Sequence, residues 1–162
     1  MQKDTIGFHR IYEQYSADIF KFSYWLTGNE TEARDLVAET FVRAWVSDTE
    51  PQVESVKAYL CTIARNLFLQ GLRNKKRRAE FPDDLQDPSP RPDEAAIARS
   101  DLEHTMKALR TLPELDRSVL IMRAEEEMSY EEIARATGLS VPAAKVRVCR
   151  ARAKLHQLLR QQ

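Results

Sequence analysis

The chain has 162 residues, 43% of them hydrophobic and 31% charged, and its 25 basic and 25 acidic residues leave no net charge at pH 7. This length can bury one moderate core or two small ones, and the high charge with only four glycines favours helices over strands. We therefore expect an all-α protein. The three histidines and two cysteines are scattered, which argues against a metal centre, a cofactor site or a disulfide framework.

The N-terminus, MQKDTIGFHR, lacks the apolar segment of a signal peptide, and no stretch approaches the roughly 20 apolar residues that cross a membrane. We expect a cytoplasmic protein without membrane insertion. Cys61 and Cys149 lie in different predicted domains, so no pairing between them is expected.

Two helices are predicted before residue 47. Apolar residues at helical spacing from Phe8 to Leu26 form the buried stripe of the first helix, which ends near Gly28. Asn29 and Glu32 are predicted to form a capping box, in which each side chain accepts from the backbone amide of the other residue, and this begins the second helix.

The second predicted helix carries a polar row. Asp35, Glu39 and Arg43 follow one another at intervals of four residues and therefore share a face. Spacing alone leaves two interpretations open: ion pairs within the helix, or a polar surface that docks on a partner helix.

A third helix is predicted at 55–78, SVKAYLCTIARNLFLQGLRNKKRR, after a polar loop that contains Pro51. Beside its buried row runs a second row at helical spacing: Tyr59, Thr62, Asn66 and Arg73. Between residues 57 and 79 there are seven basic residues and no acidic ones, including Lys75, Lys76 and Arg77. This surface could bind single-stranded DNA through phosphate attraction, stacking and hydrogen bonds. Alternatively, it is a basic helix end that complements the helix dipole.

Residues 79–95 are predicted to form a linker that separates an N-terminal domain (5–78) from a C-terminal domain (96–162). The linker is interrupted by four prolines and made acidic by Asp83, Asp84 and Asp87. In the second domain, Leu102, Met106 and Leu109 form a helix stripe. An acidic cluster at 125–127 is expected to keep the following connection solvated.

A helix-turn-helix is predicted at 128–155. Ser129 and Glu132 form a capping box for its first helix, which Gly138 ends, and Ser140 can cap the second, with Pro142 in its first turn. Two short helices joined by a glycine turn are typical of this DNA-binding motif.

The second helix of the motif has one apolar face: Ala144, Val148, Ala151, Leu155 and Leu158. Farthest from this face lie Lys145, Val146, Cys149 and Arg150, which are in place to read bases. Arg147, Arg152 and Lys154 flank it and are in place to hold phosphates. Between residues 135 and 162 there are seven basic residues and no acidic ones, a positive field that suits DNA.

Four segments together resemble the extracytoplasmic-function (ECF, group IV) bacterial RNA polymerase sigma factors. They are DLVAETFVRAW (35–45), AYLCTIARNL (58–67) with the basic run after it, LPELDRSVLIMR (112–123) and MSYEEIARATGLSVPAAKVRVCRARAKL (128–155). The four segments occur in the order that is typical of this family, with the acidic linker between the second and the third. The resemblance extends over nearly the whole chain.

The resemblance implies an initiation factor without catalytic chemistry of its own. Asp35, Glu39 and Arg43 would contact the clamp coiled coil of the largest polymerase subunit, and the C-terminal domain would contact the flap of the second subunit. The helix at 55–78 would open and read the minus-ten promoter element, with Asn66 beside a flipped-out base. The helix-turn-helix would read the minus-thirty-five element through Lys145, Val146, Arg147, Cys149, Arg150 and Arg152. The resemblance also implies a monomer held inactive by an anti-sigma factor.

Two alternatives remain open. A stand-alone helix-turn-helix regulator would need two-fold symmetry and a palindromic operator, and it leaves the basic helix and acidic linker unexplained. A helical enzyme has little support, because no clustered histidines and carboxylates, glycine-rich phosphate loop or activated nucleophile is evident. One departure from the family pattern is Pro142 and Ala143, where many members have Gly and Thr that include a phosphate-binding hydroxyl.

Overall fold

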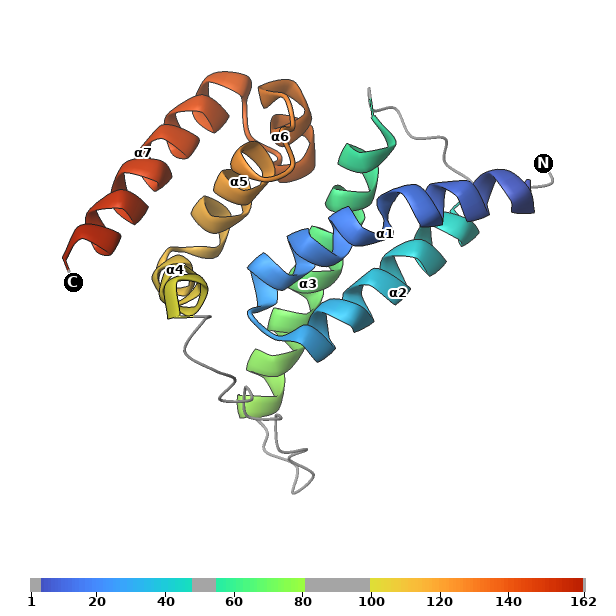
Figure 1. The fold of residues 1–162 in the computed structure, drawn as a ribbon, viewed down its shortest axis with the longest axis horizontal. Coiled ribbons are helices and arrows are strands. Elements are labelled where there is room, and N and C mark those ends of the chain that lie inside the picture. The colour runs from blue at the N-terminus through green and yellow to red at the C-terminus, as the bar shows by residue number, and fades with distance from the viewer. Residues whose placement is uncertain (1–3, 48–54, 81–99, 162) are drawn as a thin grey trace.

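The computed structural model describes residues 4–47, 55–80 and 100–161, and these form seven α-helices with no strand among them (Figure 1). The helices are α1 (Thr5–Thr27), α2 (Glu30–Val46), α3 (Val56–Glu80), α4 (Ser100–Thr111), α5 (Glu114–Ala124), α6 (Tyr130–Thr137) and α7 (Val141–Arg160). The all-α prediction is confirmed. The third helix extends two residues beyond its predicted end at 78, and most of the predicted linker lies outside the described residues.

The N-terminal unit consists of α1, α2 and α3, which pack around a core that includes Ile19, Phe22 and Leu26 of α1. Two local signals set its first hairpin. Gly28 adopts the left-handed conformation (φ 68°) that ends α1, and the Asn29 side chain accepts from the Glu32 amide at 3.0 Å to begin α2. Only this half of the predicted capping box forms, because the Asn29 amide donates to Thr27 Oγ at 3.2 Å instead of to Glu32. The fully buried part of the stripe predicted for the first helix runs from Ile19 to Leu26, whereas Tyr12, which the prediction placed in the core, is exposed because it lies nearer the open end of the unit's α1–α2 pair.

The C-terminal unit consists of α4 to α7 and contains the predicted helix-turn-helix in α6 and α7. Ser129 Oγ accepts from the Glu132 amide at 3.1 Å, and the Glu132 carboxylate accepts from the Ser129 amide at 3.0 Å, which completes the capping box. Gly138 has φ 75°, and Ser140 Oγ accepts from the Ala143 amide at 3.2 Å. The turn therefore forms as its residues predict.

The two units pack on each other through α1, α3, α5 and α6 (Figure 1), and buried residues of both contribute to one apolar cluster. The buried Arg117 guanidinium of α5 lies over the Phe68 ring of α3, 5.6 Å from its centroid. Arg65 of α3 forms an ion pair with Glu114 of α5 at 3.2 Å. Polar and apolar contacts therefore both connect the N-terminal and C-terminal units.

The acidic cluster between α5 and α6 is not solvated as predicted. Glu125 forms an ion pair with Lys21 at 2.9 Å, Glu126 lies 3.1 Å from Lys57, and the Glu126 residue is buried. Only Glu127 is exposed. The prediction was wrong because the lysines that attract these carboxylates lie on α1 and α3, far away in the sequence.

Candidate nucleic-acid and polymerase interface

Helix α7 presents the face that the sequence predicts. Ala144, Val148 and Ala151 are buried against the rest of the C-terminal unit. On the opposite side, four side chains are exposed: Lys145, Val146, Cys149 and Arg150. These four residues lie within the first three turns of the second helix of the motif, where the sequence predicts the base-reading surface.

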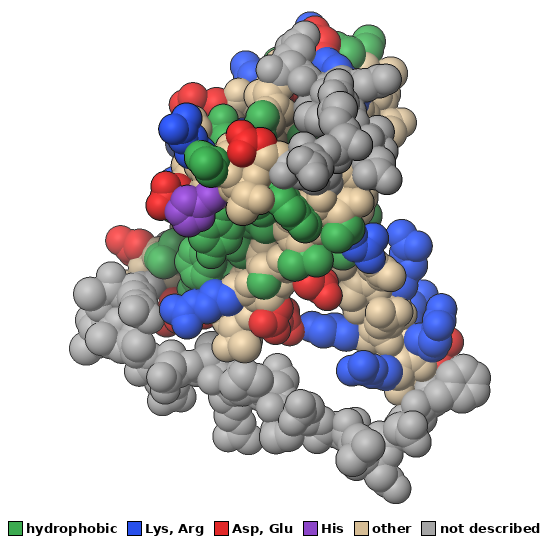
Figure 2. Space-filling view, turned by 90° about the vertical axis from the view of Figure 1, so that its right-hand side faces the viewer, with side chains coloured by type: hydrophobic (Ala, Val, Ile, Leu, Met, Phe, Trp, Pro, Cys, Tyr) green, Lys and Arg blue, Asp and Glu red, His purple; other side chains and the backbone are tan. Residues whose placement is uncertain are grey.

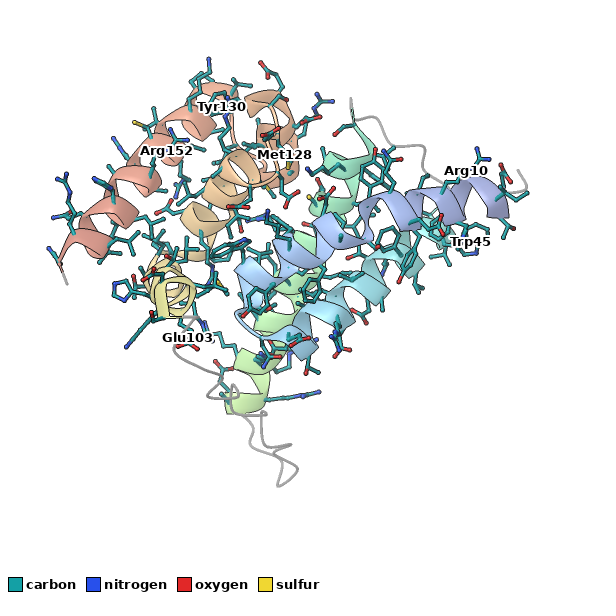
Figure 3. All side chains as sticks on the ribbon, viewed as in Figure 1. Arg10, Trp45, Glu103, Met128, Tyr130 and Arg152 are labelled. Carbon is teal, nitrogen blue, oxygen red and sulfur yellow. The ribbon has the colours of Figure 1, made fainter. Side chains whose placement is uncertain are left out.

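The flanking basic residues of α7 differ in their surroundings. Arg152 is exposed (Figure 3). Arg147 is half-buried and forms an ion pair with Asp116 of α5, with Nη1 donating to Oδ1 at 2.8 Å. This contact joins residues 31 positions apart, so helical periodicity gave no sign of it. Arg147 therefore connects α7 to α5 through one N–H group of its guanidinium.

Tyr130, the first residue of α6, lies beside two cations (Figure 3). The Arg123 guanidinium carbon is 4.4 Å from the centroid of its ring, and Lys145 Nζ is 5.6 Å from the same centroid. Such cation–π contacts hold a lysine over the ring face. Sequence analysis did not foresee that Tyr130 supports a side chain of the predicted base-reading surface.

Helix α3 has two faces with different roles. Lys57, Arg65 and Phe68 contact the C-terminal unit. On a helix with 100° per residue, Asn66 lies on the opposite side, and its side chain is exposed. Packing of the two units therefore leaves the predicted minus-ten row accessible.

The other members of that row lie where predicted but not all are equally free. Arg73, Lys75, Lys76 and Arg77 are exposed, and Tyr59 and Thr62 are half-buried. Thr62 Oγ donates to the Ala58 carbonyl at 2.8 Å, so only its lone pairs remain for a ligand. Lys75 forms an exposed ion pair with Glu32 at 2.8 Å, which DNA phosphates can displace because exposed pairs contribute little. Figure 2 shows Lys and Arg side chains gathered on this side of the molecule, near the end of α3.

The row Asp35, Glu39 and Arg43 is exposed on α2, and the described residues show no ion pair among its members. The ion-pair interpretation thus has no support in this structure, where Arg34 pairs with Glu30 instead. An open groove between α2 and α3 is lined in part by Asp35 and Glu39. The row is free to contact a partner.

Two exposed apolar residues extend this face. Val42 and Val46 are 61% and 63% exposed, and the intervals from Glu39 to Val42 and on to Val46 are three and four residues. These intervals place both valines on the same side of α2 as Asp35 and Glu39. The two valines are not among the residues predicted to form the docking surface. The signal that could have found them is their spacing, which places two apolar residues on the polar side of the helix. Figure 2 shows apolar side chains in the middle of one face of the molecule.

No group of three metal-binding side chains occurs within residues 4–47, 55–80 and 100–161. None of the helices in these ranges is long and apolar enough to cross a membrane. Both cysteines are free; Cys61 is buried, and burial raises its pKa well above 9.0 so that its thiol stays protonated, whereas Cys149 is exposed on α7.

The sequence profile of Sigma-70 region 2 matches residues 11–78, and that of Sigma-70, region 4 matches residues 103–155. The chain is 36% identical over 139 residues to the ECF RNA polymerase sigma factor EcfG of Rhodopseudomonas palustris, covering 85% of this chain and 77% of the relative. The region 2 profile covers most of the N-terminal unit (α1 to α3), and the region 4 profile covers most of the C-terminal unit (α4 to α7).

Solved structures agree. The sigma factor RpoE, in complex with the anti-sigma factor NepR from Bartonella quintana, is 30% identical, with a TM-score of 0.81 over 95% of this chain and 97% of RpoE. CnrH, in complex with the cytosolic domain of CnrY, is 27% identical, with a TM-score of 0.73 over 98% of this chain and 91% of CnrH. The chain belongs to the ECF RNA polymerase sigma factors.

Proposed function

We propose that this sigma factor binds core RNA polymerase through α2, reads and melts the minus-ten element with α3, and reads the minus-thirty-five element with α7. The observation that carries the proposal is that two helical units of one chain each present an exposed polar or basic face on the side away from their mutual contact. The polymerase supplies catalysis, and the cytoplasm, where polymerase meets the chromosome, is the proposed location.

The exposed face of α2 suits a coiled-coil partner. Asp35 and Glu39 offer carboxylates to basic residues, and Val42 and Val46 offer apolar contact beside them. A helical partner with apolar and basic rows would bury the valines while pairing the carboxylates. We assign this face to the clamp coiled coil of the largest polymerase subunit, and a contact of the C-terminal unit to the flap of the second.

Glu39→Lys is expected to weaken binding to core RNA polymerase at least about tenfold, because reversing one charge replaces attraction by repulsion at a docking face. Glu13→Lys makes the same change at an exposed residue of α1, outside the proposed contacts, and serves as the matched control. Both variants would be titrated against labelled core polymerase. Equal affinities for the two variants would exclude this docking face.

Melting is assigned to the exposed face of α3. Extruding one base costs a few kcal/mol of stacking and pairing, which hydrogen bonds from Asn66, stacking on Tyr59 and phosphate contacts from Arg73 would offset. No nucleotide hydrolysis is needed, since binding energy alone drives the exchange.

Asn66→Ala is expected to lower open-complex formation about tenfold, the loss of roughly one to two hydrogen bonds. Gln70→Ala removes another exposed amide from α3 and is the control. Permanganate reactivity of unpaired thymines reports the melted fraction at fixed polymerase. Unchanged reactivity in Asn66→Ala would remove this residue from the proposed site.

Control by an anti-sigma factor is also proposed, together with placement in group IV. The support is the similarity of nearly the whole chain to RpoE in its complex with NepR, which extends across both units and so includes their relative arrangement. An anti-sigma protein that holds these two units together would act on the arrangement seen here.

The decisive experiment for the whole proposal adds the purified chain to sigma-free core polymerase of its own organism on fragmented genomic DNA. RNA starts that share paired upstream elements are the expected result. If there are no chain-dependent starts and no co-elution with core polymerase, a stand-alone helix-turn-helix regulator becomes the better interpretation.

A further inference from the structure

The loop between α5 and α6 joins the C-terminal unit to two helices of the N-terminal unit. Its Glu125 pairs with Lys21 of α1 at 2.9 Å, and its Glu126 lies 3.1 Å from Lys57 Nζ of α3. The first pair is largely exposed and therefore contributes little to stability. The second is different, because the Glu126 side chain is only 1% exposed.

Glu126 is a buried carboxylate whose lost contact with water is only partly replaced by contacts with the protein. Neither of its oxygens has a well-aligned hydrogen-bond donor, although the Lys57 ammonium is close. Lys57 is also shared, since its Nζ lies 3.9 Å from the Asp18 carboxylate of α1. A buried charge that lacks hydrogen bonds and competes for its counter-ion is unfavourable compared with the same group in water.

Charged and titratable groups face Glu126 from each helix packed against it. Helix α1 supplies Asp18 and Lys21, and α3 supplies Lys57 and the buried thiol of Cys61. On its own unit, Glu132 lies near the same thiol and accepts a hydrogen bond from Ser55 at 3.0 Å. The two lysines favour ionised Glu126, and Asp18 disfavours it.

Burial raises the pKa of Glu126 from its ordinary value of 4.5, and the positive charges of Lys57 and Lys21 only partly oppose the rise. The pKa of Lys57 is raised from 10.5 by Glu126 and Asp18 against the effect of its own burial. Lys57 therefore stays charged through neutral pH, and of this pair Glu126 is the group that takes up a proton as the pH falls.

Protonation of Glu126 is coupled to the contact between the two units, and the direction of this coupling depends on whether Glu126 binds its proton more tightly with the units in contact or with the units separated. With the units separated, Glu126 is in water with an ordinary pKa; with the units in contact, its pKa is higher. Protonation of Glu126 therefore stabilises the contact between the two units. This stabilisation is fully present at pH values below the ordinary pKa of 4.5 and is lost as the pH rises through the raised pKa.

We propose that Glu126 makes the contact between the two units a proton-linked latch, which closes when this carboxylate takes up a proton and opens more readily when it is ionised. The latch acts on the relative placement of the α3 and α7 faces, and leaves both faces uncovered. It concerns the free chain and so does not depend on the proposed promoter function.

The test is small-angle X-ray scattering of the free, full-length chain at about pH 8, at about pH 5 and at steps between them, because exposed carboxylates stay mostly ionised over this range. The wild-type radius of gyration is expected to be smaller at the lower pH. Glu126→Gln, which mimics the protonated acid, is expected to be compact at both pH values. Glu127→Gln, the same change at the exposed neighbour, is expected to follow the wild type.

Lys57→Met gives a second, independent readout. Removing the nearby cation raises the Glu126 pKa further, so compaction is expected to occur at higher pH than in the wild type. Helical circular dichroism would confirm that each variant is folded, and unfolded variants would be replaced by Glu126→Met. A pH-independent wild-type radius, an expanded Glu126→Gln, or equal pH responses in Glu126→Gln and Glu127→Gln would each overturn the proposal. If the wild-type protein did not direct transcription but showed the expected scattering, the proposed function would fail and the proton-linked latch would still be supported.

Discussion

Arg150→Ala is expected to reduce initiation from duplex promoters roughly 5- to 150-fold, which corresponds to about 1 to 3 kcal/mol for one bidentate contact to a guanine. The guanidinium is exposed on the outer face of α7, where an inserted helix would meet base edges. The measurement is multiple-round transcription from promoters that the unmodified chain selects. The loss should be confined to promoters that carry the preferred minus-thirty-five bases.

Gln157→Ala is the control for Arg150→Ala, because Gln157 is exposed on the same helix near its C-terminal end. It should leave initiation within about twofold, since an exposed side chain outside the base-reading turns makes few contacts. A uniform loss on every promoter, with a weaker salt dependence, would assign Arg150 to phosphate contact instead of base reading.

Phe22→Ala is expected to destabilise the N-terminal unit by about 3 to 5 kcal/mol, through lost burial and the cavity that remains. Phe22 is 0% exposed and lies in the apolar cluster shared by the two units. Since small domains are stable by only about 5 to 15 kcal/mol, this change removes much of the margin. Chemical denaturation monitored by circular dichroism gives the denaturant midpoint and the slope of the transition, from which the free energy of unfolding is obtained.

Tyr12→Ala provides the comparison for Phe22→Ala. Its ring packs on Phe41 with 4.9 Å between centroids, but the residue is 44% exposed. We expect a loss of about 1 to 2 kcal/mol, because partial burial and one aromatic contact are removed without an enclosed cavity. A larger loss at Tyr12 than at Phe22 would contradict the burial described here.

Much of the fold was predictable from residues close together in the chain. The apolar stripe from Phe8 to Leu26, the caps at Asn29 and Ser129, and the glycine turns at Gly28 and Gly138 each depend on neighbours within four residues. The same short range explains why the exposed face of α7 was predicted correctly. Because the apolar side of α7 is buried against its own unit, the opposite side of the same helix is exposed to solvent.

The environment of the candidate site was less predictable. The spacing of Val42 and Val46 after Glu39 already places them on the polar side of α2, and only the expectation that valines are buried conceals their exposure. The contact of Arg147 with Asp116 requires that α5 and α7 lie side by side. That contact does not follow from periodicity, because periodicity defines faces but not their neighbours.

The helices, their ends, the helix-turn-helix and the exposed rows could all be predicted from the sequence, because hydrogen bonds and side-chain contacts within about one helical turn set them. Tertiary packing is what brings the acidic loop to Lys21 and Lys57 and buries Glu126 there. Those outcomes depend on how two packed units bring together charges that lie far apart along the chain, and on how much water the contact excludes.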